Sequence, residues 1–464
     1  MDTTRRTILR GMAAAPVAAT VGGLVLPATA HAADRPEVAA PEPPLPVPSS
    51  VSVRIRTHAE GEGEHPTDYP VTIEGLKGER SGLAGAVHYE RVVLAEPRAA
   101  WRTGKWMPNS FGKGLFPRVS GRGAFKWDRD DFKDPDWRPQ GITSEYDARL
   151  TGGPYIPLNR NLLMVSWYAR RAQRERGARI TFVDMRTRQP RYVHVLLVEP
   201  VNGSTRPGGS GRPHDFRAAD VHAGGIAWYR NRLYVADSKK RALRVFNLDE
   251  MIRVASGGNK RLVGFHDGRY HAYDYTYILP QSRAYDHVVQ GWETESTRLG
   301  YSQVAVVHTA GRSSLLVSEF RRAEREGNRP RPAIDSRIID WTLNSAGALT
   351  DGGNDAEIGS RRVYRIKNGG NVQGAVSAGG RFHLSVSDGF PNGKLNRCPV
   401  DGTATEKWGQ VPGPEDLSYQ ANYRGSRVIW GLGEYARNDQ DPSATPPEKI
   451  RTRVNSRYVY AMKL

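Results

Sequence analysis

The segment HAGGIAWYRNRLYVAD, residues 222–237, contains two short apolar runs joined by a polar turn. His222 precedes the first run, and Asp237 ends the second. The runs are rich in residues that favour strands, and the turn Tyr229–Arg232 is typical of a hairpin. The segment therefore predicts a β-hairpin with a polar side chain where its first strand begins and its second strand ends.

Four other segments repeat this arrangement. The pairs of polar residues, here called marker pairs, are Gln140 with Ser166, His222 with Asp237, Gln303 with Glu319, Gln373 with Asp388, and Asp416 with Glu434. The offsets within the pairs are 26, 15, 16, 15 and 18 residues, and the longest contains the Gly/Pro/Asn-rich insertion 151–160. Repetition of β-type units every several tens of residues predicts a β-propeller.

We predict an all-β chain folded as a β-propeller of five to seven blades, with seven favoured. Residues 51–139 could add one or two blades, and Ala272–Asp286 could open another. Innermost strands crowd together at a propeller axis, and glycine allows their backbones to approach. Such glycines are Gly141, Gly224, Gly225 and Gly374. A β-sandwich with an appended domain is the alternative.

The first 50 residues predict export. Residues 4–10 (TRRTILR) form a twin-arginine pattern, an Ala/Gly-rich apolar segment follows over 12–26, and Ala30-His31-Ala32 fits a cleavage site after Ala32. We expect a signal peptide over 1–32, a Pro-rich linker over 33–50 and one propeller domain over 51–464. The protein is thus expected to be secreted in a folded state, and its lone Cys398 allows no intrachain disulfide.

The chain is strongly basic. Its formal net charge is +18, of which the expected signal peptide carries +2, so +16 remains. A cationic surface concentrates polyanions, although arginine bias with solvated charges of both signs is the simpler explanation. No nucleic-acid-binding motif is present, and no apolar run after the signal segment nears the roughly 20 residues of a membrane span. We expect an anionic polysaccharide as partner, no nucleic acid, no membrane span and a monomeric state.

Candidate functional residues come first from the markers. Gln140, Gln303 and Gln373 either bind substrate or satisfy backbone groups at strand starts. His222 breaks this series, which favours a functional role over a structural one. His214 comes from a Gly/Pro-rich loop that we expect near the same rim.

Tyrosines 273, 275 and 277 alternate, so they share one face of a strand. They serve either as core packing or, for one of them, as a phenol at the channel mouth. The chain has no HExxH motif, no cysteine cluster and no EF-hand loop, so we assign no metal ligands. Ca²⁺ in the channel is left open as a cofactor, since carboxylate and amide oxygens suit it.

The phrases Trp137–Ile142, His222–Trp228, Leu233–Asp237 and Tyr277–Gln281 carry a resemblance. Over roughly residues 135–464 the chain resembles a family of secreted actinomycete proteins. More loosely, it is similar to the secreted propeller lyases that cleave L-rhamnosyl-α-1,4-glucuronate. That resemblance implies a seven-bladed propeller with a central site.

The lyase resemblance also implies roles for individual residues. It implies that His222 is the active histidine, that Arg283 and Arg321 bind the uronate, and that the catalytic tyrosine is among 273, 275 and 277, with Tyr275 and Tyr277 as our candidates.

β-Elimination on a uronate needs a neutralised carboxylate, a base for the C5 proton and an acid for the departing O4. Guanidinium suits the first task and imidazole the second, and a tyrosine suits the third. The favoured function is therefore a polysaccharide lyase. The alternatives are a glycoside hydrolase, using two carboxylates among the strand-end acids, and a non-catalytic propeller that binds cell-wall glycan. The candidate carboxylates are Asp237, Glu319, Asp388, Glu415, Asp416 and Glu434.

Overall fold

The computed structural model describes most of the chain after residue 52. The described residues are 53–57, 69–80, 82–87, 98–99, 101–102, 119–149, 161–170, 176–186, 189–204, 210–255, 259–291, 293–294, 298–309, 311–322, 335–352, 357–387, 392–400, 402–436 and 456–464. The predicted signal peptide, the linker and Asp388 lie outside them. No helix in this part of the chain is both long enough and apolar enough to cross a bilayer.

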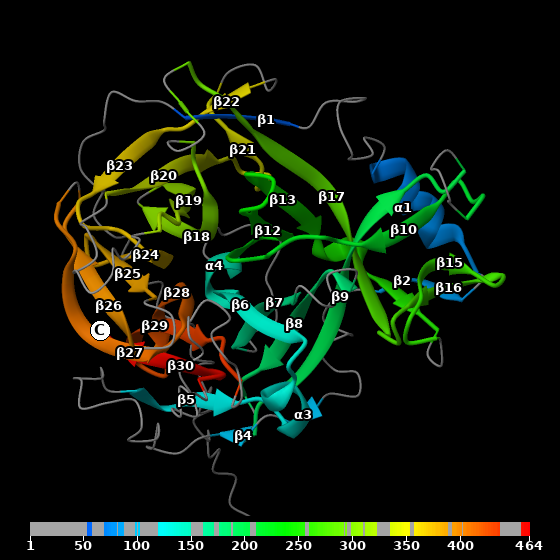
Figure 1. Ribbon diagram of the computed structural model, residues 1–464, viewed down its shortest axis with the longest axis horizontal. Helices are drawn as coiled ribbons and strands as arrows, with labels where there is room; N and C mark the ends of the chain where they lie inside the picture. The colour runs from blue at the N-terminus through cyan, green and yellow to red at the C-terminus, as the bar shows by residue number, and fades with distance from the viewer. Residues whose placement is uncertain are drawn as a thin grey trace, which may run out of the picture. The chain divides into compact units, whose positions relative to one another are not determined.

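The fold is a β-propeller, and its blades are four-stranded antiparallel sheets that follow one another along the chain (Figure 1). Blade 1 consists of β6 (Trp137–Ser144), β7 (Leu162–Ala169), β8 (Ala178–Asp184) and β9 (Arg191–Val201). Blade 2 consists of β11 (Ile226–Tyr229), β12 (Arg232–Asp237), β13 (Ala242–Asn247) and β17 (Tyr277–Val288). The first two strands of each are the hairpin that the marker pairs predict.

The remaining blades keep the same order. Blade 3 consists of β18 (Tyr301–Thr309), β19 (Arg312–Glu319), β20 (Ser336–Leu343) and β23 (Arg362–Ile366), with β21 (Leu349–Thr350) beside β20. Blade 4 consists of β24 (Val372–Ala378), β25 (Arg381–Val386), β26 (Asn392–Cys398) and β27 (Thr405–Pro412). Blade 5 consists of β28 (Pro414–Tyr423), β29 (Ser426–Gly433), β30 (Tyr458–Lys463) and β5 (Val119–Lys126), with β4 (Trp101–Arg102) at its edge.

The described residues thus form five blades. Five is the lower end of the predicted range of five to seven blades, so the blade number in this part of the chain differs from the favoured seven. The two segments expected to add blades complete existing ones instead. Val119–Lys126 is the outer strand of blade 5, and Tyr277–Val288 is the outer strand of blade 2. Each innermost strand contacts the next around the ring, β6 to β11 to β18 to β24 to β28, and β28 contacts β6 again.

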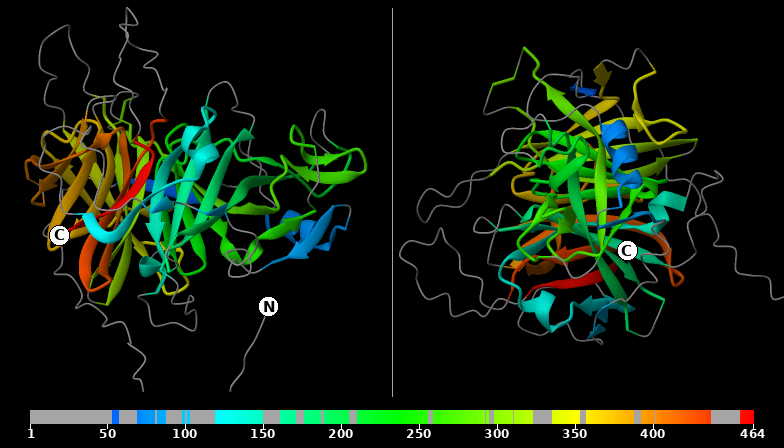
Figure 2. Two further views of the ribbon diagram at one scale, coloured as in Figure 1. Left: turned by 90° about the horizontal axis from the view of Figure 1, so that it is seen from below. Right: turned by 90° about the vertical axis from the view of Figure 1, so that its right-hand side faces the viewer.

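Further elements lie outside the blades. These are β1 (Arg54–Thr57), α1 (Tyr69–Gly78), β2 (Leu83–Ala86), β3 (Arg98–Ala99), α3 (Arg129–Lys133), α4 (Glu145–Arg149), β10 (Asp215–Ala218), the 3-10 turn Leu248–Glu250, β14 (Ile252–Val254), β15 (Val263–His266), β16 (Arg269–Ala272) and β22 (Glu357–Gly359). Helix α1, strand β2 and the β15–β16 hairpin lie together at one side, beyond β10 and β17 (Figures 1 and 2). Strand β17 also pairs in parallel with β9, which joins blades 1 and 2 at their outer edges.

The hydrophobic core lies between neighbouring blades. Separate apolar clusters fill the spaces between blades 1 and 2, 2 and 3, and 3 and 4, and another spans blade 5 and its neighbours. Six tryptophans are fully buried there, and burial of an aromatic side chain contributes about 1.5–3 kcal/mol. They are Trp127, Trp137, Trp167, Trp228, Trp341 and Trp430.

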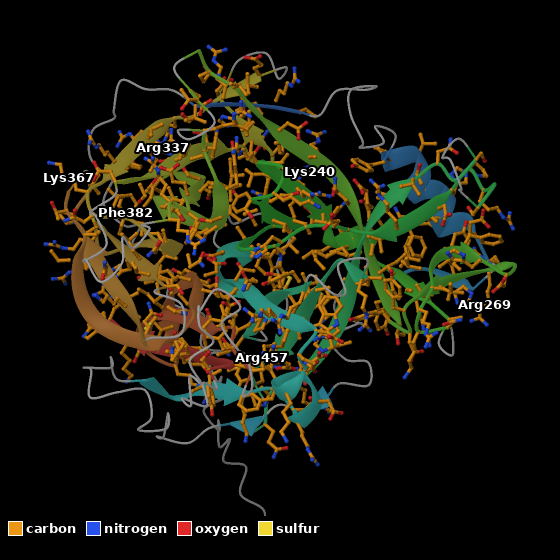
Figure 3. All side chains as sticks on the ribbon, in the orientation of Figure 1. Lys240, Arg269, Arg337, Lys367, Phe382 and Arg457 are labelled. Atoms are coloured by element: carbon orange, nitrogen blue, oxygen red, sulfur yellow. The ribbon has the colours of Figure 1, made fainter. Side chains whose placement is uncertain are left out.

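The ring is closed by a strand from the early part of the chain. Strand β5 pairs with β30, so the ends of the propeller are bonded in one sheet. Arg457, labelled in Figure 3, lies at this closure and is fully buried. Its guanidinium donates to the carbonyl oxygens of Glu434 (3.0 Å), Asp131 (2.9 Å) and Trp137 (2.6 Å). One cation therefore joins blade 5 to α3 and to the start of blade 1.

Glycine allows the innermost strands to approach, as the sequence predicts. A Cβ atom at Gly225 would lie 2.5 Å from Cα of Gln303 in blade 3, and one at Gly374 would lie 2.8 Å from Cα of Asp416 in blade 5. Both Cα atoms belong to the backbone of closely packed strands, so displacing them costs free energy.

We expect Gly225→Ala to lower the free energy of unfolding by about 2–4 kcal/mol, or to prevent folding, because overpacking here forces two blades apart. Gly291→Ala is the control, since a Cβ there would meet nothing within 4 Å. Urea unfolding followed by tryptophan fluorescence measures both. Equal midpoints for the two variants would contradict the close approach of blades 2 and 3.

Helix α4 follows β6 and lies at the centre of the ring in Figure 1, where it contacts β11 and β18. Asp147 of α4 is buried, and its carbonyl oxygen accepts a hydrogen bond from Nε2 of His308 at 3.1 Å. Nδ1 of His308 lies 2.9 Å from the Ser313 hydroxyl. Burial lowers the pKa of His308 to about 4. The folded protein therefore favours the neutral form of the His308 imidazole at neutral pH.

The low pKa of His308 predicts a pH-dependent stability. In the unfolded chain a histidine protonates near pH 6.5, so between pH 6.5 and 4 the unfolded state binds the extra proton. The contribution of His308 is complete above pH 6.5 and falls as the pH drops toward 4, by about 3 kcal/mol in all.

We expect His308→Gln to remove this part of the acid sensitivity, so that the difference in unfolding free energy from the original protein shrinks between pH 7 and pH 4.5. His266→Gln, at an exposed position in the β15–β16 hairpin, is the control and should leave the profile unchanged. Urea unfolding at several pH values measures this. A difference independent of pH would contradict the neutral, buried state of His308.

Candidate active site at the channel mouth

β-Bulges shape the starts of four innermost strands. The pairing register shifts between Pro139 and Ile142, Tyr301 and Gln303, Val372 and Gly374, and Pro414 and Leu417. A bulge turns a side chain away from the regular alternation of a strand. The marker residues Gln140, Gln303 and Gln373 and the pair Glu415–Asp416 lie at or inside these bulges. The repeat seen in the sequence is therefore a repeat of backbone irregularity at one end of the channel.

Asp416 occupies the axis, where its carboxylate joins three blades. Oδ2 accepts hydrogen bonds from the backbone N–H of Ile142 (2.9 Å) and of Ile226 (3.2 Å), and Oδ1 accepts one from Leu417 (2.8 Å). Burial raises the pKa of Asp416 well above its ordinary value, while these N–H groups and the Gln303 amide act in the opposite direction. This residue is fully buried, so its role is to hold the blades rather than to meet a substrate.

The end of the propeller where the innermost strands begin, here called the mouth, presents a stacked pair of rings formed by Tyr168 and His222. His222 precedes β11 and is exposed, and Tyr168 near the end of β7 is half-buried. Their ring centroids are 4.2 Å apart with 30° between the planes. Burial raises the pKa of Tyr168 above its ordinary value; Glu434 and Glu415 act in the same direction, and Arg138 opposes them. The phenol therefore stays protonated at neutral pH.

An ion pair lies beside these rings. Arg138 is directly opposite Tyr168 in the β6–β7 pairing. Its Nη1 is 3.1 Å from Oε2 of Glu434, and the Gln140 amide donates to the same oxygen at 3.1 Å. The guanidinium also lies 5.2 Å from the ring centroid of Tyr435. The side chains of Arg138 and Glu434 are only about a tenth exposed, so little solvent screens the pair.

Glu415 adds a second buried carboxyl group. It is 2% exposed, and its neighbour in the chain is the axial Asp416. Burial raises the pKa of Glu415 well above its ordinary value, the charge of Glu434 raises it further, and Arg138 opposes both. The mouth thus holds a carboxyl group that favours its protonated form next to a carboxylate that is paired with a guanidinium.

The predicted site residues fall into two groups. His222 and Gln140 come together at the mouth. Gln303, with its side-chain oxygen accepting from Ser318 at 3.1 Å, and Gln373 lie at the starts of their innermost strands. Arg321 follows the end of β19 on the same rim, where its carbonyl oxygen accepts from the Asn371 N–H and its Nη1 lies 3.4 Å from the Asp335 carbonyl oxygen.

The other group lies in outer strands or side elements. The Tyr275 hydroxyl accepts from Arg179 of β8 at 3.2 Å, and Tyr277 packs in the core between blades 1 and 2. Arg283 lies on the outer strand of blade 2, with its Nη1 3.5 Å from the Tyr285 hydroxyl. The ring of His214 packs against Gly75 of α1. The structure brings Tyr168, rather than Tyr275 or Tyr277, against His222.

Two residues of the mouth were missed at the sequence level, Arg138 and Tyr168. Each lies two residues from a marker, Arg138 before Gln140 and Tyr168 after Ser166. Side chains two residues apart in a strand share a face. Including the residue two positions before Gln140 and the residue two positions after Ser166 would therefore have identified both. The strand-end acids Asp237 and Glu319 instead pair with Arg244 and Arg337, with contacts of 2.8 and 2.7 Å.

Among the described residues, no group of three or more His, Cys, Asp or Glu side chains is arranged to hold a metal ion. The chain's own residues at the mouth supply a base, an acid, a guanidinium and two carboxyl groups, which suffice for acid–base chemistry on a bound ligand.

No known family model matches the chain, and no curated protein matches it. Among solved structures it is similar to RS223 beta-xylosidase, at 10% identity over 70% of this chain and 92% of that one, with a TM-score of 0.29. It is also similar to the polysaccharide lyase Uly1, at 9% identity over 82% of this chain and all of that one, with a TM-score of 0.24.

A further similar structure is the PQQ-bound aldose sugar dehydrogenase of Streptomyces coelicolor, at 11% identity over 70% of this chain and 93% of that one, with a TM-score of 0.28. These three proteins carry out different reactions, and the likenesses are too weak to decide among them. The predicted lyase resemblance stays a prediction.

The two carboxyl groups at the mouth predict opposite responses to amide substitution. Glu415→Gln should change the free energy of unfolding at pH 7 by less than about 1 kcal/mol, because an amide resembles a protonated carboxyl group. Glu434→Gln should lower it by about 3–5 kcal/mol, because the buried Arg138 loses its counter-charge. Urea unfolding of both variants measures the difference, and equal losses would contradict the assigned protonation of Glu415.

Proposed function

We propose that the protein is a secreted carbohydrate-active enzyme that cleaves a uronate-containing glycan by β-elimination at the channel mouth. The observation that carries the proposal is the exposed His222 ring stacked on Tyr168 beside Arg138. It supports the proposal because an imidazole, a protonated phenol and a guanidinium come together there. The basic character of the chain supports an anionic substrate.

The proposed roles follow from the chemistry of each group. Arg138 pairs with the uronate carboxylate and offsets its negative charge, which makes the C5 proton more acidic. His222 takes that proton through its imidazole nitrogen. The C5–H electrons form the C4–C5 double bond, the C4–O4 bond breaks, and the Tyr168 hydroxyl protonates O4. Each proton that leaves or arrives thus has a named donor or acceptor.

A glycoside hydrolase is the second candidate, and the two unlike carboxyl groups favour it. Glu415 would act as the acid and Glu434 as the base or nucleophile. Exposure separates the two candidates. Glu415 is 2% and Glu434 8% exposed, whereas His222 is exposed and Tyr168 half-buried. A catalytic group must reach the reacting bond, so the accessible His222–Tyr168 pair favours elimination.

The test is ultraviolet absorbance of unsaturated uronate during incubation with uronate polymers. We expect His222→Ala and Tyr168→Phe each to lower kcat by about 100-fold or more, as loss of a general base or acid does. Both variants should keep the unfolding free energy within about 1 kcal/mol, since neither change leaves a buried charge. Glu250→Gln, on the 3-10 turn after β13, is a control that should keep full activity.

The hydrolase is tested in the same reactions by reducing-end release. Release without ultraviolet absorbance, abolished by Glu434→Gln or Glu415→Gln and preserved in His222→Ala, would replace the lyase with the hydrolase. Full elimination activity in His222→Ala would overturn the role given to this residue.

A further inference from the structure

The end of the propeller opposite the mouth is built from the turns that join the first and second strands of the blades. In blades 2 to 5 each of these turns carries arginine, and none has an acidic residue in its sequence. The connection of blade 1 differs, because its described part, α4, carries the buried acids Glu145 and Asp147. The arginines are Arg230 and Arg232 in blade 2, Arg312 in blade 3, Arg381 in blade 4, and Arg424 and Arg427 in blade 5.

The arginines gather most closely where blades 2 and 3 meet. A Cβ atom at Gly347, in the turn after β20, would lie 3.5 Å from the Cδ atoms of both Arg230 and Arg232. The Tyr229 and His308 rings of the two turns are 6.1 Å apart. The turn of blade 3 therefore lies beside the turn of blade 2.

The start of β23 brings two more guanidiniums to this junction. Burial lowers the pKa of Arg312, and the charges of Arg361 and Arg362 lower it further, while Asp340 opposes them. Asp340 is buried and pairs with Arg361. Arg312, Arg361 and Arg362 are thus close enough for their charges to repel, and Asp340 offsets part of this repulsion. The nearby acids of the β21–β22 edge are engaged elsewhere, Glu357 with Arg54 and Asp351 with the Gly359 N–H.

Several of these guanidiniums keep unused donors. Among the described residues, the Nε atoms of Arg230, Arg232, Arg312 and Arg361 are buried and have no hydrogen-bond partner. A buried donor without a partner costs about 1–3 kcal/mol. An anion bound beside these side chains would reduce the repulsion among their charges.

The basic surface continues onto blade 4. Arg381 begins β25 opposite Ala378, and Arg397 lies directly opposite His383 in the β25–β26 pairing. Both guanidiniums therefore lie near the same end of blade 4. The surface formed by Arg230, Arg232, Arg312, Arg361, Arg362, Arg381 and Arg397 is here called the arginine face.

We propose that the arginine face is a second binding surface, which holds an anionic linear polysaccharide of the polyuronate type away from the site of cleavage. Guanidinium binds carboxylate through two parallel hydrogen bonds and keeps its charge at all relevant pH values. Arginines spread over neighbouring blades suit a chain with a charge on each sugar. The choice of polyuronate rests on the proposed function, whereas the surface itself does not.

The tyrosines of this face argue against single-stranded nucleic acid, which binds by stacking its bases on exposed aromatic rings. Arg230 covers Tyr229 at 5.8 Å, and in the corresponding turn of blade 5, next to the face, Arg424 covers Tyr423 at 5.7 Å. Both rings are at most 3% exposed. The face therefore offers guanidiniums without stacking platforms.

The test compares two double variants of the full chain with equal loss of charge. Arg230→Gln with Arg312→Gln removes two cations of the arginine face. Arg253→Gln with Arg261→Gln removes two exposed cations near β14 and β15, in the side elements. Affinity electrophoresis in polygalacturonate gels, at several salt concentrations, measures binding in the His222→Ala background, so that no polymer is cleaved.

We expect the Arg230→Gln, Arg312→Gln variant to bind polygalacturonate about tenfold more weakly. The slope of log affinity against log salt concentration should become shallower by about one to two, as it does when phosphate contacts are lost in nucleic-acid binding. The control pair should match the parent protein. The first pair should also leave kcat on a short oligouronate unchanged while raising KM for the polymer.

Equal weakening by both pairs would overturn the proposal, because net charge alone would then explain binding. So would absence of binding by the parent protein. Loss of affinity for duplex DNA with unchanged affinity for polygalacturonate would assign the face to nucleic acid instead. Binding is measured without turnover, so a failure of the proposed lyase activity leaves this result interpretable.

Discussion

The propeller depends on the Asp416 carboxylate, which binds N–H groups of blades 1, 2 and 5 at the axis. Innermost strands of different blades do not form sheet hydrogen bonds with one another, so their inner N–H groups need other acceptors. A single carboxylate has about four acceptor positions and can serve several strands that converge from different directions. Glycines at the same level, such as Gly225, remove the side chains that would hold these strands apart.

The same convergence explains why the site lies where it does. Gln140 and Glu415 lie in bulges at the strand starts, and the carboxylate of Asp416, next to Glu415, joins blades 1, 2 and 5. Tyr168 and His222 lie nearer to solvent than these buried carboxyl groups, so their side chains remain accessible. A rigid buried layer therefore supports the candidate reactive residues Tyr168 and His222. The Arg138–Glu434 pair links them to this layer, because Glu434 accepts a hydrogen bond from the buried Gln140 and Arg138 lies opposite Tyr168.

The marker pairs predicted the blades well because each pair is the first hairpin of a blade, and its side chains obey local rules of alternation and turn formation. They could not give the blade number, since Val119–Lys126 joins blade 5 through pairing with β30, more than 300 residues later in the chain. The site was predicted in part for the same reason. His222 and Gln140 are markers of the candidate site, whereas the choice of Tyr168 over Tyr275 and Tyr277 depends on which strand lies beside His222, and the local pattern does not carry that information.

Charged side chains are paired differently at the two ends of the propeller. At the mouth, Arg138 faces Glu434, and at the strand ends Arg244 faces Asp237 and Arg337 faces Glu319. These pairs leave little net charge within the blades. The turns of blades 2 to 5 at the opposite end carry arginines without acids, so part of the excess positive charge of the described residues lies there. If the arginine face binds a polyanion as we propose, a long polymer held there keeps its other segments at high local concentration near the mouth.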